Sequence, residues 1–135
     1  MAASLKTNTC LTYLDFSYNA LSTEGGCTLG NSLISNHTLK YLKIANTAVD
    51  QSACITIVQG IILNDTLLEV VLDGNPIGEQ GMKALMIVPV STRANLSISC
   101  INCNTTIKDP LCVYSDPVAK VKEGKFYHNP FFDAN

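Results

Sequence analysis

Few residues in this chain have the type and spacing needed for catalysis. The two histidines are His37 and His128, and neither stands beside a serine or cysteine together with an acidic residue that could orient it. The sequence contains no phosphate-binding loop of the G-x-G-x-x-G type. We therefore expect a protein that is not an enzyme and that binds no cofactor.

Cysteine is the other residue type that could do chemistry here. The cysteines are Cys10, Cys27, Cys54, Cys100, Cys103 and Cys112. Cys100 and Cys103 have the Cys-x-x-Cys spacing of a zinc ligand pair, but zinc needs two further ligands, and Cys112 and His128 are poorly placed to supply them. We expect no metal site, free thiols in a reducing compartment, and Cys100 and Cys103 as small apolar side chains on a strand.

Two asparagines, Asn36 and Asn64, carry the Asn-x-Thr pattern of N-glycosylation. Asn8 precedes Asn36 by the interval that separates Asn36 from Asn64, but it lacks the pattern. A recurrence at one spacing favours a structural role over a sugar acceptor. We expect each Asn to end a helix in the left-handed backbone conformation that Asn tolerates, just before the next strand.

Composition limits the classes of protein to consider. The 135 residues are 47% hydrophobic and 15% charged, which suits one ordinary domain with its own core. The net charge is −2 and no basic run is present, which argues against binding to nucleic acid or a membrane surface. The longest apolar stretches, 55–63 and 85–90, are far shorter than the roughly 18–20 residues that span a bilayer. The start lacks the apolar core of a signal peptide, so we predict a cytoplasmic protein, with the cytoskeleton as a further place of association.

A repeat with a 28-residue period organises most of the chain. The segments Leu11–Leu21, Leu39–Val49 and Leu67–Ile77 share the pattern L-x-x-L-x-L-x-x-N-x-L, with Val, Ile or Phe in place of some leucines. A weaker fourth copy starts at Leu96. The ninth position of the four copies holds Asn19, Thr47, Asn75 and Asn104.

The stretches between these segments repeat with the same period. Met1, Leu29, Ile57 and Leu85 follow one another at this interval, and so do Leu5, Leu33 and Ile61. Within a unit these apolar residues are four apart, the spacing of one helical face. Each unit therefore predicts a short strand, a turn and a helix of about three turns. Small residues at the helix starts (Gly25, Ala53, Gly81) predict close packing rather than an anion site, and Pro89 should end or distort the third helix.

The pattern resembles the leucine-rich repeat of the ribonuclease-inhibitor-like type, over residues 1–106. The resemblance implies an α/β solenoid of about 3–4 repeats, with a curved parallel sheet inside and helices outside. It also implies that the ninth-position amide binds backbone groups where the chain leaves the strand. Thr47 has only a hydroxyl, so we expect its turn to be less well satisfied.

The two ends of the chain depart from the repeat. Met1 falls in the middle of a repeat helix, which predicts a segment lacking an N-terminal cap, a piece of a longer repeat protein or a truncated gene model, and self-association through the open edge. Residues 107–135 leave the repeat as an extended segment. Its aromatics are Phe126, Tyr127, Phe131 and Phe132. They would either cover the open end of the solenoid or dock a partner.

Side chains on the exposed face of the sheet are the best candidates for function. Strand residues alternate between the two faces, so positions three, five and seven of each unit share one face. This face would carry Tyr13, Asp15, Tyr41, Lys43, Glu69 and Asp73, with Tyr18 at its rim. We expect Tyr13 to lie beside Tyr41 and Asp15 to face Lys43. The surface is either a protein-binding site, since solenoids use this face, or an ordinary set of cross-strand pairs.

These features favour a non-catalytic protein-interaction module or scaffold whose partner the sequence does not name. Two alternatives remain. Some proteins of this repeat type activate small GTPases through polar residues at the edge of the solenoid, but no such residue can be matched here. A fragment of an innate-immune receptor would need a signal peptide or a nucleotide-binding domain upstream.

Overall fold

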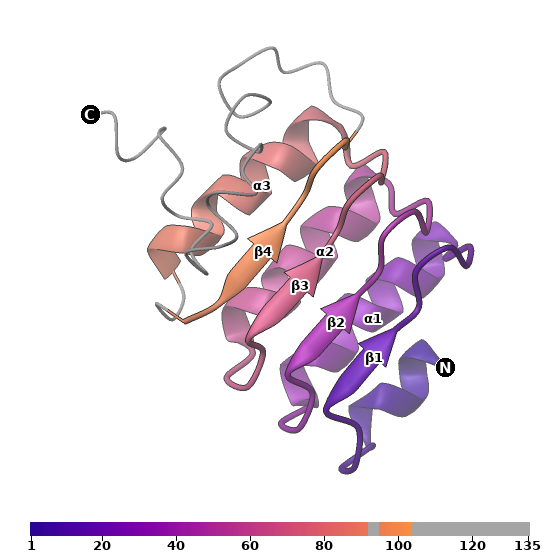
Figure 1. The fold of residues 1–135 in the computed structure, drawn as a ribbon, viewed down its shortest axis with the longest axis vertical. Coiled ribbons are helices and arrows are strands. Elements are labelled where there is room, and N and C mark those ends of the chain that lie inside the picture. Colours follow the sequence, from indigo (N-terminus) through magenta and orange to yellow (C-terminus); the bar gives the residue numbers. More distant parts are fainter. Residues whose placement is uncertain (92–94, 104–135) are drawn as a thin grey trace.

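The computed structural model describes residues 1–91 and 95–103, which form an alternating series of strands and helices (Figure 1). The elements are a 3₁₀ helix η1 (Ala2–Lys6), β1 (Tyr13–Asp15), α1 (Thr23–Ser35), β2 (Tyr41–Lys43), α2 (Gln51–Leu63), β3 (Glu69–Val71), α3 (Gly78–Ser91) and β4 (Ser97–Ser99). Asn104, Cys112, His128 and the aromatic segment lie outside the described residues, as does the expected boundary at 106/107. None of the described helices has the length and apolarity to cross a membrane.

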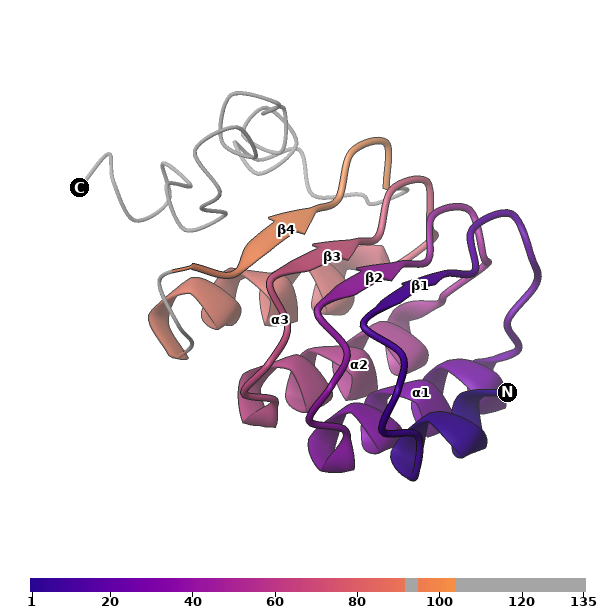
Figure 2. The same cartoon turned by 60° about the horizontal axis from the view of Figure 1, so that its bottom comes forward.

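The strands form one parallel sheet in the order β1-β2-β3-β4. Tyr13, Tyr41, Glu69 and Ser97 lie side by side in register, so each step across the sheet advances the chain by one repeat. All the helices cover the same face of the sheet (Figure 2). A helix is about 10 Å wide and a strand needs about 4.8 Å, so this stacking places the sheet on the narrower, concave side. The predicted leucine-rich repeat solenoid is confirmed.

The core lies between the sheet and the helices. The fourth and sixth positions of the second unit, Leu42 and Ile44, are fully buried, as are the helix residues Leu29 and Ile57. The first unit differs because, among the described elements, no strand lies on the outer side of β1. Its Leu11 is 41% exposed, whereas the equivalent Leu39 is 0% exposed.

Neighbouring helices approach closely through small residues. A Cβ on Gly26 would lie 2.5 Å from the Ala53 Cβ, and one on Gly60 would lie 2.2 Å from the Gly30 carbonyl oxygen. Close packing is confirmed, although the tight contact of α1 is at Gly26 rather than at Gly25. Pro89 does not end the third helix, because α3 runs on to Ser91.

Side chains cap the first two helices. Ser22 Oγ accepts the Gly25 N–H (3.0 Å) at the start of α1, and Asp50 Oδ1 accepts the Ala53 N–H (2.9 Å) at the start of α2. The Thr23 hydroxyl of the preceding unit also donates to Asp50. The hydrogen bonds from Thr23 and from the Ala53 N–H lower the pKa of the Asp50 carboxyl.

Asn36 ends α1 and ties three parts of the chain together. Its Nδ2 donates to the carbonyl oxygens of Leu5 (2.8 Å) and Asn8 (3.1 Å) in the preceding unit. Its Oδ1 accepts the N–H groups of Thr38 (3.1 Å) and Leu39 (2.8 Å), which lead into β2. The side chain is 1% exposed, so a glycan on this nitrogen is incompatible with the fold.

Asn64 does the same work one repeat later. Its Nδ2 donates to the carbonyl oxygens of Leu33 (2.8 Å) and Asn36 (2.9 Å), and its Oδ1 accepts the N–H groups of Thr66 and Leu67 (each 2.8 Å). Both asparagines have extended backbone, with φ of −90° and −83°. The prediction of a left-handed conformation is therefore wrong. The connection between helix and strand is stabilised by the hydrogen bonds of the Asn side chain and not by a left-handed backbone.

A second row of amides supports the turns after the strands. Asn75 Nδ2 donates to the carbonyl oxygens of Ile44 (2.7 Å) and Leu72 (2.8 Å). Its Oδ1 accepts the N–H groups of Thr47 (2.9 Å) and Val49 (3.1 Å), which belong to the preceding unit. The ninth-position amide thus binds backbone groups at the strand exit and also joins two units.

The polar groups of Thr47 all have hydrogen-bond partners, although its side chain is shorter than the Asn found at this position in the first and third units. Its hydroxyl donates to the Ile44 carbonyl oxygen (2.8 Å), and its buried N–H is accepted by Asn75 of the following unit. The prediction of a poorly satisfied turn is wrong, because the neighbouring repeat supplies the acceptor.

Candidate functional site

The helices cover one face of the sheet (Figure 2). The strand residues that alternate with the inward Leu14, Leu42 and Val70 carry the predicted polar and aromatic side chains of the opposite face. Tyr13 is 49% exposed and Tyr41 is 38% exposed, and they are partners in the β1–β2 register. Their ring centroids are 6.3 Å apart with the planes tilted by 43°. This geometry is within the range of favourable aromatic pairs, so the predicted contact is confirmed.

Lys43 completes a cluster with the two tyrosines. Its Nζ lies 5.4 Å from the centroid of the Tyr13 ring, a cation–π distance. The Tyr13 phenol, followed by the Glu69 carboxylate, raises the pKa of Lys43. The lysine therefore stays charged beside two exposed aromatic rings. We call Tyr13, Tyr41 and Lys43 the sheet-face cluster.

Asp15 is the register partner of Lys43, but its carboxylate has a different contact. Its Oδ1 accepts the backbone N–H of Ser17 (3.0 Å), and this bond is the main cause of the lowered pKa of Asp15. No ion pair joins Asp15 to Lys43 among residues 1–91 and 95–103. The strand register places Asp15 opposite Lys43, while the Asp15 carboxylate is held by its hydrogen bond to the Ser17 N–H.

Asp73 has a role within the fold. Its Oδ1 accepts the Ser99 hydroxyl (2.6 Å) and the Ile101 N–H (2.8 Å), which belong to the following unit. Ser17, at the same repeat position, accepts the Ala45 N–H in the same way (3.1 Å). Asp73 thus lies at the sheet face, but one of its oxygens links two repeats.

Tyr18 lies at the rim in an unusual conformation. It is 81% exposed and has φ of 64°, in the left-handed region that large side chains rarely adopt. The equivalent residues Asn46, Gly74 and Asn102 also have positive φ, of 53°, 69° and 57°. These are residue types that tolerate this conformation, so the fold demands it at the eighth position and Tyr18 is the exception. In the sequence, this requirement was visible only as Asn, Gly and Asn at the eighth position of the other three units.

The cysteines among the described residues are free thiols. No group of three or more His, Cys, Asp or Glu residues is placed to hold a metal within these residues. Burial raises the pKa of Cys54 to about 12 and that of Cys103 to about 11, so both stay protonated thiols. The Cys-x-x-Cys pair lies just beyond β4 rather than on it, because the strand ends at Ser99. His37 Nδ1 lies 2.8 Å from Asp65 Oδ1 in an exposed contact between two connectors.

Comparisons with known proteins agree with this fold. A family model described as leucine-rich repeat matches residues 7–30 and 63–86, two stretches whose starts lie two repeats apart. No curated protein matches the sequence. A solved structure titled "Leiomodin-1 Actin-Binding Site 2 (ABS2)" has a TM-score of 0.71 and 19% identity over 82% of this chain. This chain covers 65% of that structure, less than two thirds of its length. The chain thus has the leucine-rich repeat fold, and the family model matches two of its repeats.

Proposed function

We propose that this chain is a non-catalytic scaffold that binds a protein partner on the exposed face of its sheet. The sheet-face cluster would form the centre of the interface and Tyr18 its rim, with Asp15, Glu69 and Asp73 around them. Tyrosine is enriched at binding hot spots because it combines a large contact area with a polar tip. Lysine over a tyrosine ring adds a fixed charge that can orient a partner.

The observation that carries this proposal is the conformation of Tyr18. A left-handed conformation costs a side chain about 1–2 kcal/mol, and the other units avoid this with Asn or Gly. An 81% exposed ring receives little compensation from burial in the free protein. Backbone strain of this kind concentrates at functional sites, which supports a contact made by Tyr18 when a partner is bound.

Actin is the first partner to test. The structural likeness is to a fragment whose title names an actin-binding site, and at 19% identity that likeness reaches the fold alone. An actin-binding role accords with the cytoplasmic, cytoskeleton-associated location that we propose. The uniform 28-residue spacing, with 13-residue helices in α1 and α2, supports the ribonuclease-inhibitor-like subtype.

Co-sedimentation with filamentous actin tests this assignment. The wild type should pellet with filaments, and a Tyr13→Ala/Tyr41→Ala/Lys43→Ala variant should remain in the supernatant. A Glu79→Ala/Lys83→Ala variant removes an exposed ion pair on α3, on the other side of the molecule, and should pellet like the wild type. Equal pelleting of all three proteins would reject the sheet-face cluster as the actin site.

A GTP hydrolysis assay with a panel of small GTPases tests the alternative function. The scaffold proposal predicts no acceleration by the purified chain. Acceleration that survives the triple substitution would favour the GTPase-regulating class, whose functional residues lie at the edge of the solenoid rather than on the sheet.

A further inference from the structure

The exposed face of the sheet carries more negative than positive charge. Within the part of the chain that the structure describes, its strand and turn positions hold three carboxylates, and Lys43 supplies the one ammonium group. The carboxylates belong to Asp15, Glu69 and Asp73. The hydrogen bond from the Ser17 N–H lowers the pKa of Asp15, which is therefore ionised at neutral pH. Charge complementarity consequently favours a basic segment as the occupant of this face.

Tyr13 already holds a cation on this face. The Lys43 Nζ lies 5.4 Å from the centroid of its ring, and the ring electrons of tyrosine attract positive charge. Tyr41 presents a second ring beside the first and is 38% exposed. Among the described residues, no cation lies over the Tyr41 ring. The face therefore has one tyrosine ring with a bound cation and one without.

Glu69 places a carboxylate next to the second ring. It is the register partner of Tyr41 on the adjacent strand, and parallel neighbours are about 4.8 Å apart. The Glu69 side chain is partly buried and forms no ion pair within residues 1–91 and 95–103. The Tyr13 phenol is the largest cause of the raised pKa of Lys43, and the Glu69 charge is a smaller one. Lys43 is thus held mainly by Tyr13, and the Glu69 oxygens can accept hydrogen bonds from a ligand.

A ring and a carboxylate side by side suit the guanidinium group of arginine. The guanidinium is planar, so it stacks on an aromatic face, and its paired N–H groups bind a carboxylate through two parallel hydrogen bonds. The ammonium of lysine is a compact and strongly hydrated charge that lacks this geometry. Lys43 adds a further restriction, because its charge beside Tyr13 repels a second cation from that ring.

We propose that the sheet face binds a basic segment of its partner, with an arginine stacked on Tyr41 and paired with Glu69. This arginine site rests on the proposed function, because it is part of the same face and specifies the chemistry of the partner. Tyr41 would supply contact area, Glu69 the two acceptor oxygens, and Lys43 the repulsion that keeps the guanidinium off Tyr13. The remaining carboxylates of the face would attract neighbouring basic side chains of the segment.

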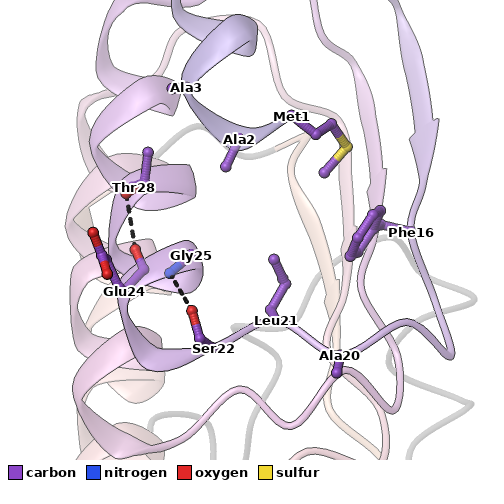
Figure 3. Close-up of a pocket in the computed structure, with 10 residues that line it drawn as sticks. All are labelled: Met1, Ala2, Ala3, Phe16, Ala20, Leu21, Ser22, Glu24, Gly25 and Thr28. Atoms are coloured by element: carbon purple, nitrogen blue, oxygen red, sulfur yellow. Dashed lines mark hydrogen bonds between the residues drawn. The ribbon is translucent and has the colours of Figure 1, made fainter.

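A cavity of about 370 Å³ also has an aromatic ring and a carboxylate in its lining, but in a different arrangement (Figure 3). It is bordered by η1 and the start of α1, and Phe16 and Glu24 are among the residues that line it. The two side chains lie on opposite sides of the cavity in Figure 3, so they do not form a ring–carboxylate pair. Glu24 therefore provides a matched control, a glutamate whose replacement should not affect arginine binding.

The probe is a set of peptides, acetyl-Gly-Gly-X-Gly-Gly-amide, in which X is arginine, lysine or citrulline. Citrulline has the size of arginine but no charge. Added to the ¹⁵N-labelled full chain, the arginine peptide should cause saturable NMR shifts at the backbone amides of Tyr41 and Glu69, with a dissociation constant in the millimolar range. The lysine peptide should bind about fivefold more weakly, and the citrulline peptide should cause no saturable shift. Equal effects of the peptides, no saturable shift with the arginine peptide, or shifts centred on Glu24 would overturn the proposal.

Two substitutions separate the role of the ring from that of the carboxylate. Glu69→Gln keeps the size of the side chain and removes its charge, and should weaken binding of the arginine peptide about tenfold while thermal melting stays unchanged. Tyr41→Leu removes the ring and should weaken binding about threefold. Glu24→Gln should bind like the wild type. Equal binding by Glu69→Gln and the wild type would contradict the proposal, whatever the folding of Tyr41→Leu.

Affinity capture with the same variants distinguishes the arginine site from the proposed function. Glu69→Gln should lower about tenfold the capture of a partner that the Tyr13→Ala/Tyr41→Ala/Lys43→Ala variant also loses. A partner that the triple variant loses and Glu69→Gln retains at the wild-type level would leave the proposed function standing and overturn the arginine site. Arginine-selective peptide binding without any partner lost by the triple variant would support the arginine site and contradict the proposed function.

Discussion

Asn64 and Asn8 occupy the same repeat position, one inside the solenoid and one at its N-terminal edge. Inside, both ends of the amide bind backbone groups, and the side chain is 2% exposed. At the edge the oxygen has the same local partners, but the nitrogen donates to nothing in the described chain. The contrast shows that each repeat residue has a local task and a task toward its neighbour. Substitutions in the two places should separate these tasks.

The largest difference is expected between Asn64→Asp and Asn8→Asp. Inside, the new carboxylate would face the carbonyl oxygens of Leu33 and Asn36 in a buried site, which should cost about 3–5 kcal/mol of unfolding free energy. At the edge no donated bond is lost, so the change should stay within about 0.5 kcal/mol. Urea unfolding followed by circular dichroism measures both. Equal losses would show that the nitrogen of Asn8 also has a partner in the folded chain.

The turn asparagines should follow with a smaller gap. Asn75→Ala leaves the buried N–H groups of Thr47 and Val49 without their acceptor, which should cost about 2–4 kcal/mol. Asn19→Ala removes only exposed bonds and should cost about 1 kcal/mol or less. The same unfolding experiment applies. A larger loss for Asn19→Ala would mean that the first turn is not open at its outer side.

Two glycines extend the comparison to the helices. A Cβ at Gly60 would overlap the Gly30 carbonyl oxygen, so Gly60→Ala should destabilise by about 1–3 kcal/mol. A Cβ at Gly25 would have as its nearest neighbour the flexible end of the Leu21 side chain, 3.3 Å away. Gly25→Ala should therefore be neutral or stabilise by up to about 1 kcal/mol, the usual helix gain. Thermal melting measures both variants. An equal fall of the melting temperature in Gly60→Ala and Gly25→Ala would contradict this distinction.

Tyr18 should show the opposite sign from the inner asparagines. Tyr18→Asn places there the residue type found at the equivalent positions 46 and 102, and should stabilise by about 1 kcal/mol. It should also weaken the binding of a sheet-face partner. Melting temperature and partner affinity are measured on the same preparation. A destabilised variant would contradict the argument that this ring strains the backbone.

The smallest expected effect concerns the helix caps. The pKa of Asp50 is lowered in the fold, so the carboxylate contributes stability at neutral pH, and that contribution is lost as the pH falls below about 4 toward the lowered pKa. The cap of the first helix, Ser22, does not titrate. Asp50→Asn should therefore flatten the decline of the urea midpoint between pH 5 and 3, whereas Ser22→Ala should leave its slope unchanged. An unchanged slope in Asp50→Asn would show that the cap does not control the acid response.

The sequence predicted the strands, their register and the core because one repeat period fixes all three. The same phase placed Tyr13 beside Tyr41. It did not predict the hydrogen bonds of Thr47 and Asp73, since their partners are backbone or side-chain groups of a following unit that only the stacked fold brings near. The left-handed eighth position was visible only as the Asn, Gly, Asn series, which Tyr18 interrupts.

The extended backbone of Asn36 illustrates the same limit. Asn is common both as a left-handed helix cap and as a residue whose side chain hydrogen-bonds the backbone between a helix and a strand. The residue type alone does not distinguish the two roles. The distinguishing feature is a pair of carbonyl oxygens supplied by the preceding repeat.

Quantitative affinity capture from cell extract is the measurement that tests the proposed function most directly. The wild type, the Tyr13→Ala/Tyr41→Ala/Lys43→Ala variant and the Glu79→Ala/Lys83→Ala control are compared by mass spectrometry at matched folding, checked by melting. The account predicts at least one partner that the control retains and that the triple variant loses by about tenfold or more, the effect of removing hot-spot contacts. Identical partner profiles for all three proteins would contradict the claim that the sheet-face cluster is a binding site.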